Sequence, residues 1–188
     1  IKNICIKNNL LLFLDEVQSG FGRSGKLFSY QWSDIEPDVM AVAKGIGSGF
    51  PMGACLATNK SSIGMTKGTH GSTFGGNPLA IAVGTAVINE ITSKNFLDIV
   101  DNISRYLWNE LVTLKKEFDE IIEVRGAGLL LGIKTKSNNI EISKLFETHG
   151  LLTIPASDNV VRLSPPLIIN KKDVDIAIRI IRNTLKNI

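Results

Sequence analysis

Two short apolar runs each end in a charged residue that could take part in chemistry. The run Leu10–Leu14 ends at Asp15, and the run Val39–Ala43 ends at Lys44. Unbroken apolar runs of this length, bounded by polar and glycine residues, are typical of strands buried on both faces in a parallel sheet. Ligands of open α/β sheets lie beyond the carboxyl ends of the strands. We therefore expect the Asp15 carboxylate and the Lys44 amine to lie at the same edge.

Each of these two residues also has a purely structural interpretation. An aspartate after a strand is commonly a turn former, and a lysine is commonly a solvated surface charge. Lys44, however, follows five apolar residues and precedes the uncharged, glycine-rich stretch Gly45–Gly49. A lysine amine in an apolar setting is a nucleophile suited to Schiff-base formation. The aldehyde cofactor pyridoxal phosphate also needs a carboxylate against its ring nitrogen, which Asp15 could supply.

The stretch Gly20–Gly25 matches the dinucleotide-binding pattern G-x-G-x-x-G letter for letter. In that motif the first glycine forms the tight turn directly after the strand, whereas five residues separate Leu14 from Gly20 here. No clear amphipathic helix follows the glycines either. The pattern therefore favours a flexible loop around the site over a dinucleotide site.

A second loop, His70–Pro78, contains three glycines and the hydroxyls of Ser72 and Thr73. Hydroxyls and free backbone amides in such loops suit a phosphate group, although plain turn chemistry explains the same residues. His70 and His149 show no ligand spacing with each other or with the cysteines, so no metal site is expected.

Composition describes an ordinary globular protein with no nucleic-acid or membrane partner. The 188 residues are 44% hydrophobic and 21% charged, and the net charge is only +3. No apolar run reaches the roughly 20 residues of a membrane span. Cys5 and Cys55 both lie among apolar neighbours, which predicts two buried free thiols in a reducing, cytoplasmic compartment. Because the first residue is Ile1 rather than Met, we expect this chain to be part of a longer protein.

Two domains are expected, residues 1–93 and 94–188, divided near Ser93–Lys94. The first domain should contain strands 10–14, 39–43 and 52–58, a short helix 27–32 and a longer helix that starts at Pro78 and ends near residue 92. The second should contain helices 97–118, 140–149 and 172–185 with strands 129–135, 151–154 and 160–163, which is an α+β arrangement.

Longer motifs, in the same order along the chain, resemble those of the class III, fold type I aminotransferases, and most of all their acetylornithine aminotransferase branch. They are Asp15–Gly25, Pro37–Asp38, Lys44–Gly45, Gly49–Ala54, His70–Pro78, Val124–Leu129 and Asn159–Pro166. The resemblance implies an α/β fold: the C-terminal part of a large domain that binds pyridoxal phosphate, with a mostly parallel sheet and helices, followed by an α+β small domain.

The resemblance also implies roles for the first motif. Lys44 would form the Schiff base with pyridoxal phosphate and move a proton between cofactor and substrate, while Asp15 pairs with the ring nitrogen. Glu16, Val17 and Gln18 complete the cofactor-binding motif. Val17 would pack on one face of the ring, and Gln18 would bond near the phenolic oxygen.

Three residues further along gain roles in the same way. Thr73 would reach the cofactor phosphate of the neighbouring subunit in a homodimer, and Ser72 would contact the substrate. Arg162 follows a short strand and precedes Pro165–Pro166, where its guanidinium can grip a carboxylate. A surface arginine on an edge strand is the alternative, and the resemblance favours substrate binding. Arg125 is interpreted as structural.

The implied reaction is transfer of the terminal amino group of N-acetylornithine to 2-oxoglutarate, in arginine biosynthesis, by a cytoplasmic homodimer with a shared active site. Enzymes for ornithine, succinyl-diaminopimelate or 4-aminobutyrate share these motifs and stay open as alternatives. A glutamate-semialdehyde aminomutase would tend to have Met in place of Gln18. A non-catalytic binding module is disfavoured by the intact pair Asp15 and Lys44. The 188 residues alone are expected to be inactive, because an upstream half would supply most of the phosphate cup, the ring-stacking aromatic side chain and a second substrate arginine.

Overall fold

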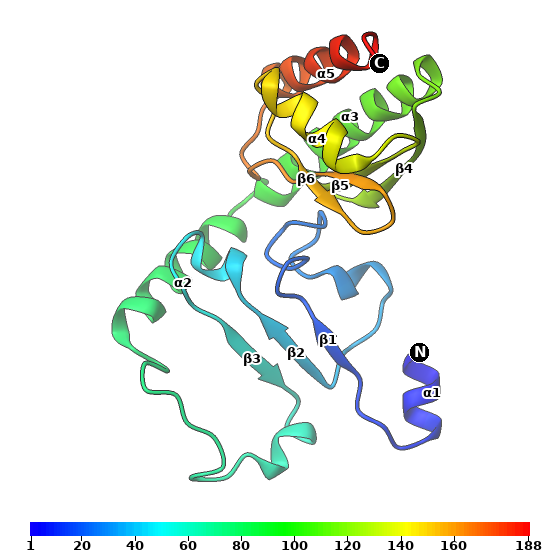
Figure 1. Ribbon diagram of the computed structural model, residues 1–188. Helices are drawn as coiled ribbons and strands as arrows, with labels where there is room; N and C mark the ends of the chain where they lie inside the picture. Colours follow the sequence, from blue (N-terminus) through cyan, green and yellow to red (C-terminus); the bar gives the residue numbers. More distant parts are fainter. The chain divides into compact units, whose positions relative to one another are not determined.

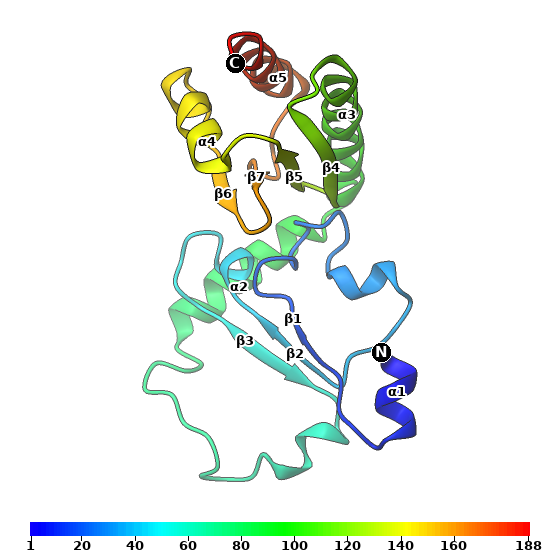
Figure 2. The ribbon, with the colours of Figure 1, turned by 45° about the vertical axis from the view of Figure 1, so that its right-hand side comes forward.

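The computed structural model describes all of residues 1–188, which form two compact units (Figures 1 and 2). The first unit is Ile1–Phe96 and the second is Leu97–Ile188. The sequence suggested a division after residue 93, whereas the contacts divide the chain at the first turn of helix α3 (Phe96–Glu117). None of the helices is long and apolar enough to cross a membrane.

The first unit is built on a three-stranded sheet of order β1-β2-β3. Strand β1 (Phe13–Asp15) pairs in parallel with β2 (Val39–Val42), and β3 (Ala54–Ala57) pairs with β2 in the antiparallel direction. Strands β2 and β3 lie within the stretches expected from the sequence, whereas β1 starts three residues later than expected and extends one residue past the expected end, to Asp15. The sheet is mixed rather than mostly parallel within this chain, since only one of its two pairings is parallel.

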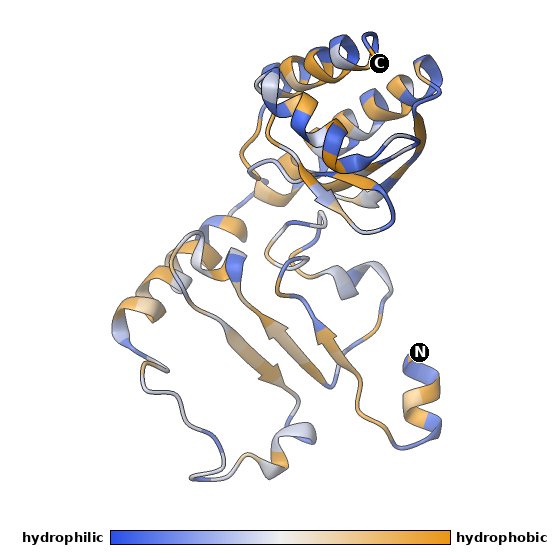
Figure 3. Cartoon of the chain, viewed as in Figure 1, coloured by the Kyte–Doolittle hydropathy of each residue, from blue (hydrophilic) through white to orange (hydrophobic).

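The expectation that the strands of the two apolar runs are buried on both faces is wrong for β1 in this chain, and β3 is not buried either. Met40 and Val42 of β2 are buried, but every residue of β3 is exposed and Phe13 of β1 is 56% exposed. Figure 3 shows that the strands are apolar along their length nonetheless. The apolar composition is therefore correct for buried strands, while the residues of this chain leave much of the sheet uncovered.

Helices at the two ends of the first unit are held by specific contacts. Helix α1 (Lys2–Lys7) is tied to the start of β2 by an ion pair between Lys2 Nζ and Asp38 Oδ2, 3.0 Å apart. Helix α2 (Pro78–Ile91) starts with proline in its first turn, and the Asn77 side chain accepts a hydrogen bond from the Ala80 amide. Three short 3₁₀ turns connect the rest: η1 (Ser29–Trp32), η2 (Lys44–Gly47) and η3 (Ser61–Gly64).

The two cysteines differ, contrary to the expectation that both are buried. Cys5 in α1 is buried, whereas Cys55 in β3 is exposed, and both are free thiols. Cys55 has apolar neighbours in sequence, but its strand is exposed as a whole. Local composition alone therefore did not reveal its exposure.

The second unit packs three helices on a four-stranded antiparallel sheet of order β4-β5-β7-β6. The strands are β4 (Ile121–Ala127), β5 (Leu130–Thr135), β6 (Ile154–Ala156) and β7 (Val160–Leu163). Helices α3, α4 (Asn139–Thr148) and α5 (Lys171–Leu185) gather on one side of the sheet (Figures 1 and 2). This is the expected α+β arrangement, with one strand, β4, that the sequence analysis missed.

Strand β4 makes a tight hairpin with β5 that depends on Gly126. Gly126 has φ of +126°, and a Cβ there would lie 2.1 Å from the Leu130 carbonyl oxygen. Only glycine is compatible with this approach of two backbones. The sequence analysis assigned no element to this segment, which contains glycine, a residue uncommon inside strands.

Candidate active site

Strands β1 and β2 deliver Asp15 and Lys44 to the same edge of the first unit. Asp15 pairs with Ala41 in the parallel register, and the Glu16 amide donates a 2.9 Å hydrogen bond to the Ala41 carbonyl. Lys44 begins η2, two residues after β2 ends. A carboxylate and an amine therefore leave neighbouring parallel strands at their carboxyl ends, where ligands of α/β sheets bind.

Lys44 occupies a tight and conformationally costly turn. Its φ is +45°, in the left-handed region that non-glycine residues rarely adopt, and Ala43 before it is fully extended. Such a conformation costs about 1–2 kcal/mol and persists only where the surroundings hold it. The lysine side chain is exposed, so residues of this chain do not supply the apolar setting that the sequence suggested.

Asp15 uses one carboxylate oxygen within the chain. Its Oδ1 accepts a 2.9 Å hydrogen bond from the Val17 amide, which fixes the turn directly after β1. The residue is exposed and Val17 is half-buried. The turn-forming role and a cofactor role are thus compatible, because a carboxylate has a second oxygen that can face a ring nitrogen.

Glu16 is buried and its carboxylate is bonded inside its own loop, while its expected place among the cofactor-binding residues stays a prediction. It is 2% exposed, its Oε2 accepts from the Ser19 hydroxyl at 2.5 Å, and its Oε1 accepts from the Tyr30 amide at 2.9 Å. Both oxygens are engaged by groups of the loop that follows β1. Glu16 is therefore a structural member of the motif.

The glycine-rich segment after β1 is a closely packed loop rather than a flexible one. Phe21 is 4% exposed and contacts Phe28 edge-to-face, with ring centroids 5.6 Å apart. The Ser29 hydroxyl donates a 2.8 Å hydrogen bond to the hydroxyl of buried Ser24. The backbone carbonyl of Ser24 accepts a 2.9 Å hydrogen bond from Trp32 Nε1. The aromatic and serine residues between 19 and 32 were the available signal for this packing, and the glycines obscured it.

The structure does not bring Ser72 and Thr73 to Asp15 and Lys44 of the same chain. Because β3 is antiparallel to β2, it carries the chain back to the opposite edge, where the Thr58 amide bonds the Asp38 carbonyl at 3.1 Å. The exposed loop before α2 continues from that far end (Figure 1). Within this chain Thr73 is therefore not part of the arrangement at Asp15 and Lys44.

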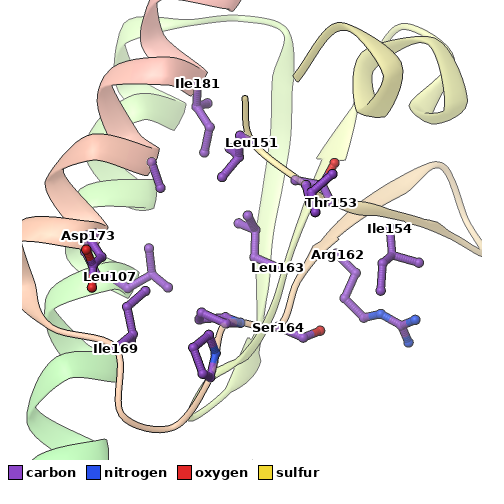
Figure 4. Close-up of a pocket in the computed structure, with 15 residues that line it drawn as sticks. Leu107, Leu151, Thr153, Ile154, Arg162, Leu163, Ser164, Ile169, Asp173 and Ile181 are labelled. Carbon is purple, nitrogen blue, oxygen red and sulfur yellow. The ribbon is translucent and has the colours of Figure 1, made fainter. Parts of the chain in front are cut away.

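Arg162 lies in the second unit, on a central strand and not on an edge strand as the alternative interpretation supposed. Strand β7 is bonded on both sides, and Arg162 pairs with Gly132 of β5 and Ile154 of β6. Arg162 is one of the residues that line a pocket of about 480 Å³, and Figure 4 shows its guanidinium pointing away from Leu107 and Ile181, on the side of Ile154. Apolar residues form most of the lining, Arg162 is its only basic side chain and Asp173 its only acidic one.

Arg125 has the structural role that the sequence suggested, in an ionic cluster on the same sheet. Its Nη2 lies 2.8 Å from Asp158 Oδ2, while Lys134 Nζ lies 2.6 Å from Asp158 Oδ1. The Lys134 ammonium first, and the Arg125 guanidinium second, hold the pKa of Asp158 below its ordinary value. The cluster ties β4 and β5 to the turn between β6 and β7.

The residues at the edge of β1 and β2 fit pyridoxal phosphate by the chemistry of their donors. A primary amine can hold the cofactor aldehyde covalently, and a carboxylate can keep the ring nitrogen protonated. The Asp15–Lys44 pair supplies both functions from adjacent strands. Val17, half-buried beside this pair, is an apolar side chain suited to a ring face.

Comparison with known proteins agrees with this arrangement. Residues 1–185 match the family model for aminotransferase class-III. The acetylornithine aminotransferase of Mesorhizobium japonicum is 46% identical over 189 residues, which cover 100% of this chain and 47% of that protein. The chain thus spans about half the length of the curated relatives it matches.

Solved structures show the same fold. The acetylornithine aminotransferase of Elizabethkingia anophelis gives a TM-score of 0.91 at 33% identity, covering 100% of this chain and 48% of that one. The ornithine delta-aminotransferase of Plasmodium falciparum gives 0.91 at 35% identity, covering 98% and 48%. These matches confirm the expected α/β fold, and with a family match over residues 1–185 they establish that the chain belongs to the class-III aminotransferases.

Proposed function

We propose that the complete protein is a pyridoxal-phosphate-dependent aminotransferase that moves the terminal amino group of N-acetylornithine to 2-oxoglutarate. The observation that carries the proposal is the delivery of Asp15 and Lys44 to one edge by adjacent parallel strands. The choice of amino donor is supported by acetylornithine aminotransferases at 43–49% identity. A place in arginine biosynthesis and a cytoplasmic location are further proposals that follow from this reaction.

Four residues of this chain would have separate roles at the cofactor. Bound pyridoxal phosphate supplies an electron sink for the negative charge that develops on the substrate carbon. Lys44 would hold the cofactor aldehyde. After its amine is released from the aldehyde, Nζ would carry a proton. Asp15 would keep the ring nitrogen protonated, since an adjacent carboxylate favours the charged form of a base. Val17 and Gln18, which follow Asp15 directly, would contact the ring face and its phenolic oxygen.

Arg162 and Ser72 are proposed to bind substrate. N-acetylornithine and 2-oxoglutarate both carry a carboxylate, which a guanidinium can bind with two parallel hydrogen bonds. This assignment is supported by the Asn159–Pro166 motif that contains Arg162, and Figure 4 shows the guanidinium pointing away from the apolar side chains of the pocket. Ser72 is assigned only from its motif, and its exposed loop leaves its hydroxyl accessible.

A homodimer with a shared site is proposed because one chain does not complete the site. Thr73 lies in an exposed loop that continues from the edge of the sheet opposite Lys44. Its hydroxyl would therefore serve the cofactor phosphate of a second subunit.

The alternative amino donor is ornithine. Ornithine aminotransferases of Plasmodium falciparum and Plasmodium yoelii superpose as well as the acetylornithine enzymes do, with TM-scores of 0.91 and 34–35% identity. The two donors differ in the charge of the α-amino group, which acetylation removes. Relative kcat/KM for N-acetylornithine and ornithine, with 2-oxoglutarate as acceptor, distinguishes the two.

The test is the Lys44→Ala substitution in the complete protein. We expect loss of transamination by at least about 10²–10⁴-fold, the range for removal of an acid–base group, together with loss of covalently held cofactor. The Lys60→Ala variant, at an exposed lysine near η3, is the control and should retain activity. Full activity of the Lys44→Ala variant would contradict the assignment.

The same variant tests the shared site. Mixing Lys44→Ala subunits with Thr73→Ala subunits should restore part of the activity, because some hybrid dimers contain one site with both residues intact. The absence of recovered activity, with subunit exchange verified by mass spectrometry, would show that each site is built from one chain.

A further inference from the structure

The turn that contains Lys44 packs against the loop that follows β1. Gly45 lies directly against Phe21, and a Cβ on Gly45 would be 2.9 Å from the Phe21 Cβ. On its other side the turn contacts helix α2, where a Cβ on Gly84 would lie 3.9 Å from the Ile46 side chain. The left-handed Lys44 is thus fixed between two neighbours, and this contact explains how its unfavourable φ persists.

Phe21 is itself held in a fixed and unusual conformation. Its φ is +53°, it is 4% exposed, and its ring packs edge-to-face on Phe28. A bulky residue in the left-handed region needs support from its surroundings, as Lys44 does. The position of Gly45 therefore depends on what fixes Phe21.

The Glu16 carboxylate fixes this loop at both ends. Its two oxygens bind the Ser19 hydroxyl and the Tyr30 amide, which lie before and after Phe21 in the sequence. Its backbone carbonyl accepts the Gly20 amide at 3.0 Å, and a Cβ on Gly20 would lie 2.8 Å from that same oxygen. A buried carboxylate with both oxygens bonded is costly to disturb, since each lost bond leaves a desolvated group unpaired.

We propose that Glu16 is a positioning residue for Lys44, acting through the Gly20–Phe21 turn that packs on Gly45. Both oxygens of the Glu16 carboxylate are bonded within the loop, and its effect is to hold the backbone from which the Lys44 amine extends. The inference rests on the proposed function only in taking Lys44 as the reacting amine.

The experiment compares Glu16→Gln with Glu36→Gln in the complete protein. Glutamine retains the shape and one acceptor oxygen but presents an NH₂ group to one of the two donors, so the loop loses one charge-assisted bond. Glu36 is an exposed carboxylate of the same unit and provides the same chemical change without the buried partners. Far-UV circular dichroism and thermal melting establish that both variants are folded at the assay temperature.

The first measurement needs no cofactor. Hydrogen exchange of the apoprotein is followed in peptides that cover residues 43–50, whose amides are bonded within the turn, as in Ile46 to Ala43 at 3.2 Å and Ser48 to Gly45 at 3.2 Å. Glu16→Gln should raise exchange there roughly tenfold, the factor expected for loss of one hydrogen bond to a charged group. Peptides from α4 serve as an internal reference, and Glu36→Gln should match the wild type throughout.

The second measurement is the rate at which pyridoxal phosphate attaches to Lys44. Apoprotein is mixed with the cofactor, the product is reduced with borohydride at timed intervals, and the label is located by mass spectrometry. Attachment should slow about tenfold in Glu16→Gln, with no change in Glu36→Gln. A Gly45→Ala substitution should slow it too, and the double variant should show a less than additive loss because both changes act through one contact.

The outcomes separate this inference from the proposed function. Unchanged exchange at residues 43–50 in folded Glu16→Gln overturns the inference whatever the activity, as do unchanged attachment or additive losses in the double variant. A wild-type protein that takes the cofactor on Lys44 but transaminates neither N-acetylornithine nor ornithine overturns the proposed substrates, while the exchange data still decide the role of Glu16. The inference is supported if hydrogen exchange at residues 43–50 rises and attachment of pyridoxal phosphate slows in Glu16→Gln and Gly45→Ala but not in Glu36→Gln.

Discussion

The two units of this chain differ sharply in how well their own residues bury them. Every large side chain with essentially no exposure belongs to the second unit, among them Leu111, Ile133 and Phe146. The first unit has fewer than half as many buried apolar residues, and its strand β3 is exposed throughout. The reactive pair Asp15 and Lys44 nevertheless belongs to the first unit.

The difference follows from how each sheet is covered. In the second unit three amphipathic helices meet one antiparallel sheet whose strands are neighbours in sequence, apart from the short crossover through α4. In the first unit the sheet is apolar on both faces, as parallel α/β sheets are, but only α2 and the connecting loops cover it. The second unit is thus self-sufficient, whereas we infer that the chemistry depends on further polypeptide for burial.

The largest predicted effect comes from separating the units. Residues 97–188 expressed alone should be monomeric and unfold cooperatively, because their core is complete. Residues 1–96 alone should aggregate or stay unfolded, because the exposed edge and faces of β3 invite association. Size-exclusion chromatography and thermal melts by circular dichroism provide the comparison. Cooperative, monomeric folding of residues 1–96 would break the contrast between the units.

A smaller effect is expected from a single cavity in the complete core. Leu111 is 0% exposed, so Leu111→Ala in residues 97–188 should lower the free energy of unfolding by about 2–5 kcal/mol. Leu152 is 82% exposed, and Leu152→Ala should change it by less than about 0.5 kcal/mol. Urea unfolding followed by Trp108 fluorescence measures both. Equal decreases in the free energy of unfolding for the two variants would contradict the assignment of Leu111 to the core and of Leu152 to the surface.

The sequence predicted the second unit well because its helices carry strong periodic patterns. Helix α3 was expected at 97–118 and is found at Phe96–Glu117, and β7 was expected and found at residues 160–163. Strand β4 was left unassigned; it contains Gly126 and is followed by Gly128, both with positive φ, and glycine is depleted in strands. A glycine needed for close backbone approach and a glycine in a free loop have the same appearance in sequence.

At the candidate site the sequence predicted where Asp15 and Lys44 lie in the sheet better than it predicted the burial and bonding of the side chains. The exit of Asp15 and Lys44 from neighbouring strands followed from two apolar runs, since parallel strands present their carboxyl ends together. The exposure of Lys44 and the bonding of the Glu16 carboxylate within its own loop could not be predicted from the sequence pattern, because each depends on tertiary neighbours. Phe21 was hidden for the same reason, as nothing in the local pattern shows that Gly45 will pack on it.

The smallest predicted effect concerns the ionic cluster at the surface of the second unit. Hydrogen bonds from Lys134 and Arg125 lower the pKa of Asp158 from its ordinary value of 3.8, so the folded state favours the charged carboxylate. A depressed folded-state pKa contributes stability that is present above the unfolded-state value and is lost as the pH falls through the folded-state value. The contribution of the cluster should therefore be complete at neutral pH and disappear below pH 3.8.

Asp158→Asn in residues 97–188 tests this pH dependence. At pH 7 the variant should melt less than about 3 °C below the wild type, because exposed ion pairs contribute little and are screened by solvent. The difference should shrink as the pH falls below 3.8 and through the lowered pKa of folded Asp158, where the wild-type carboxylate becomes protonated as well. Asp119→Asn, at an exposed aspartate without an ion pair, is the matched control and should melt with the wild type at every pH. A difference between Asp158→Asn and wild type that persists unchanged at acid pH would mean that the side chain stabilises the hairpin through hydrogen bonding alone, without its charge.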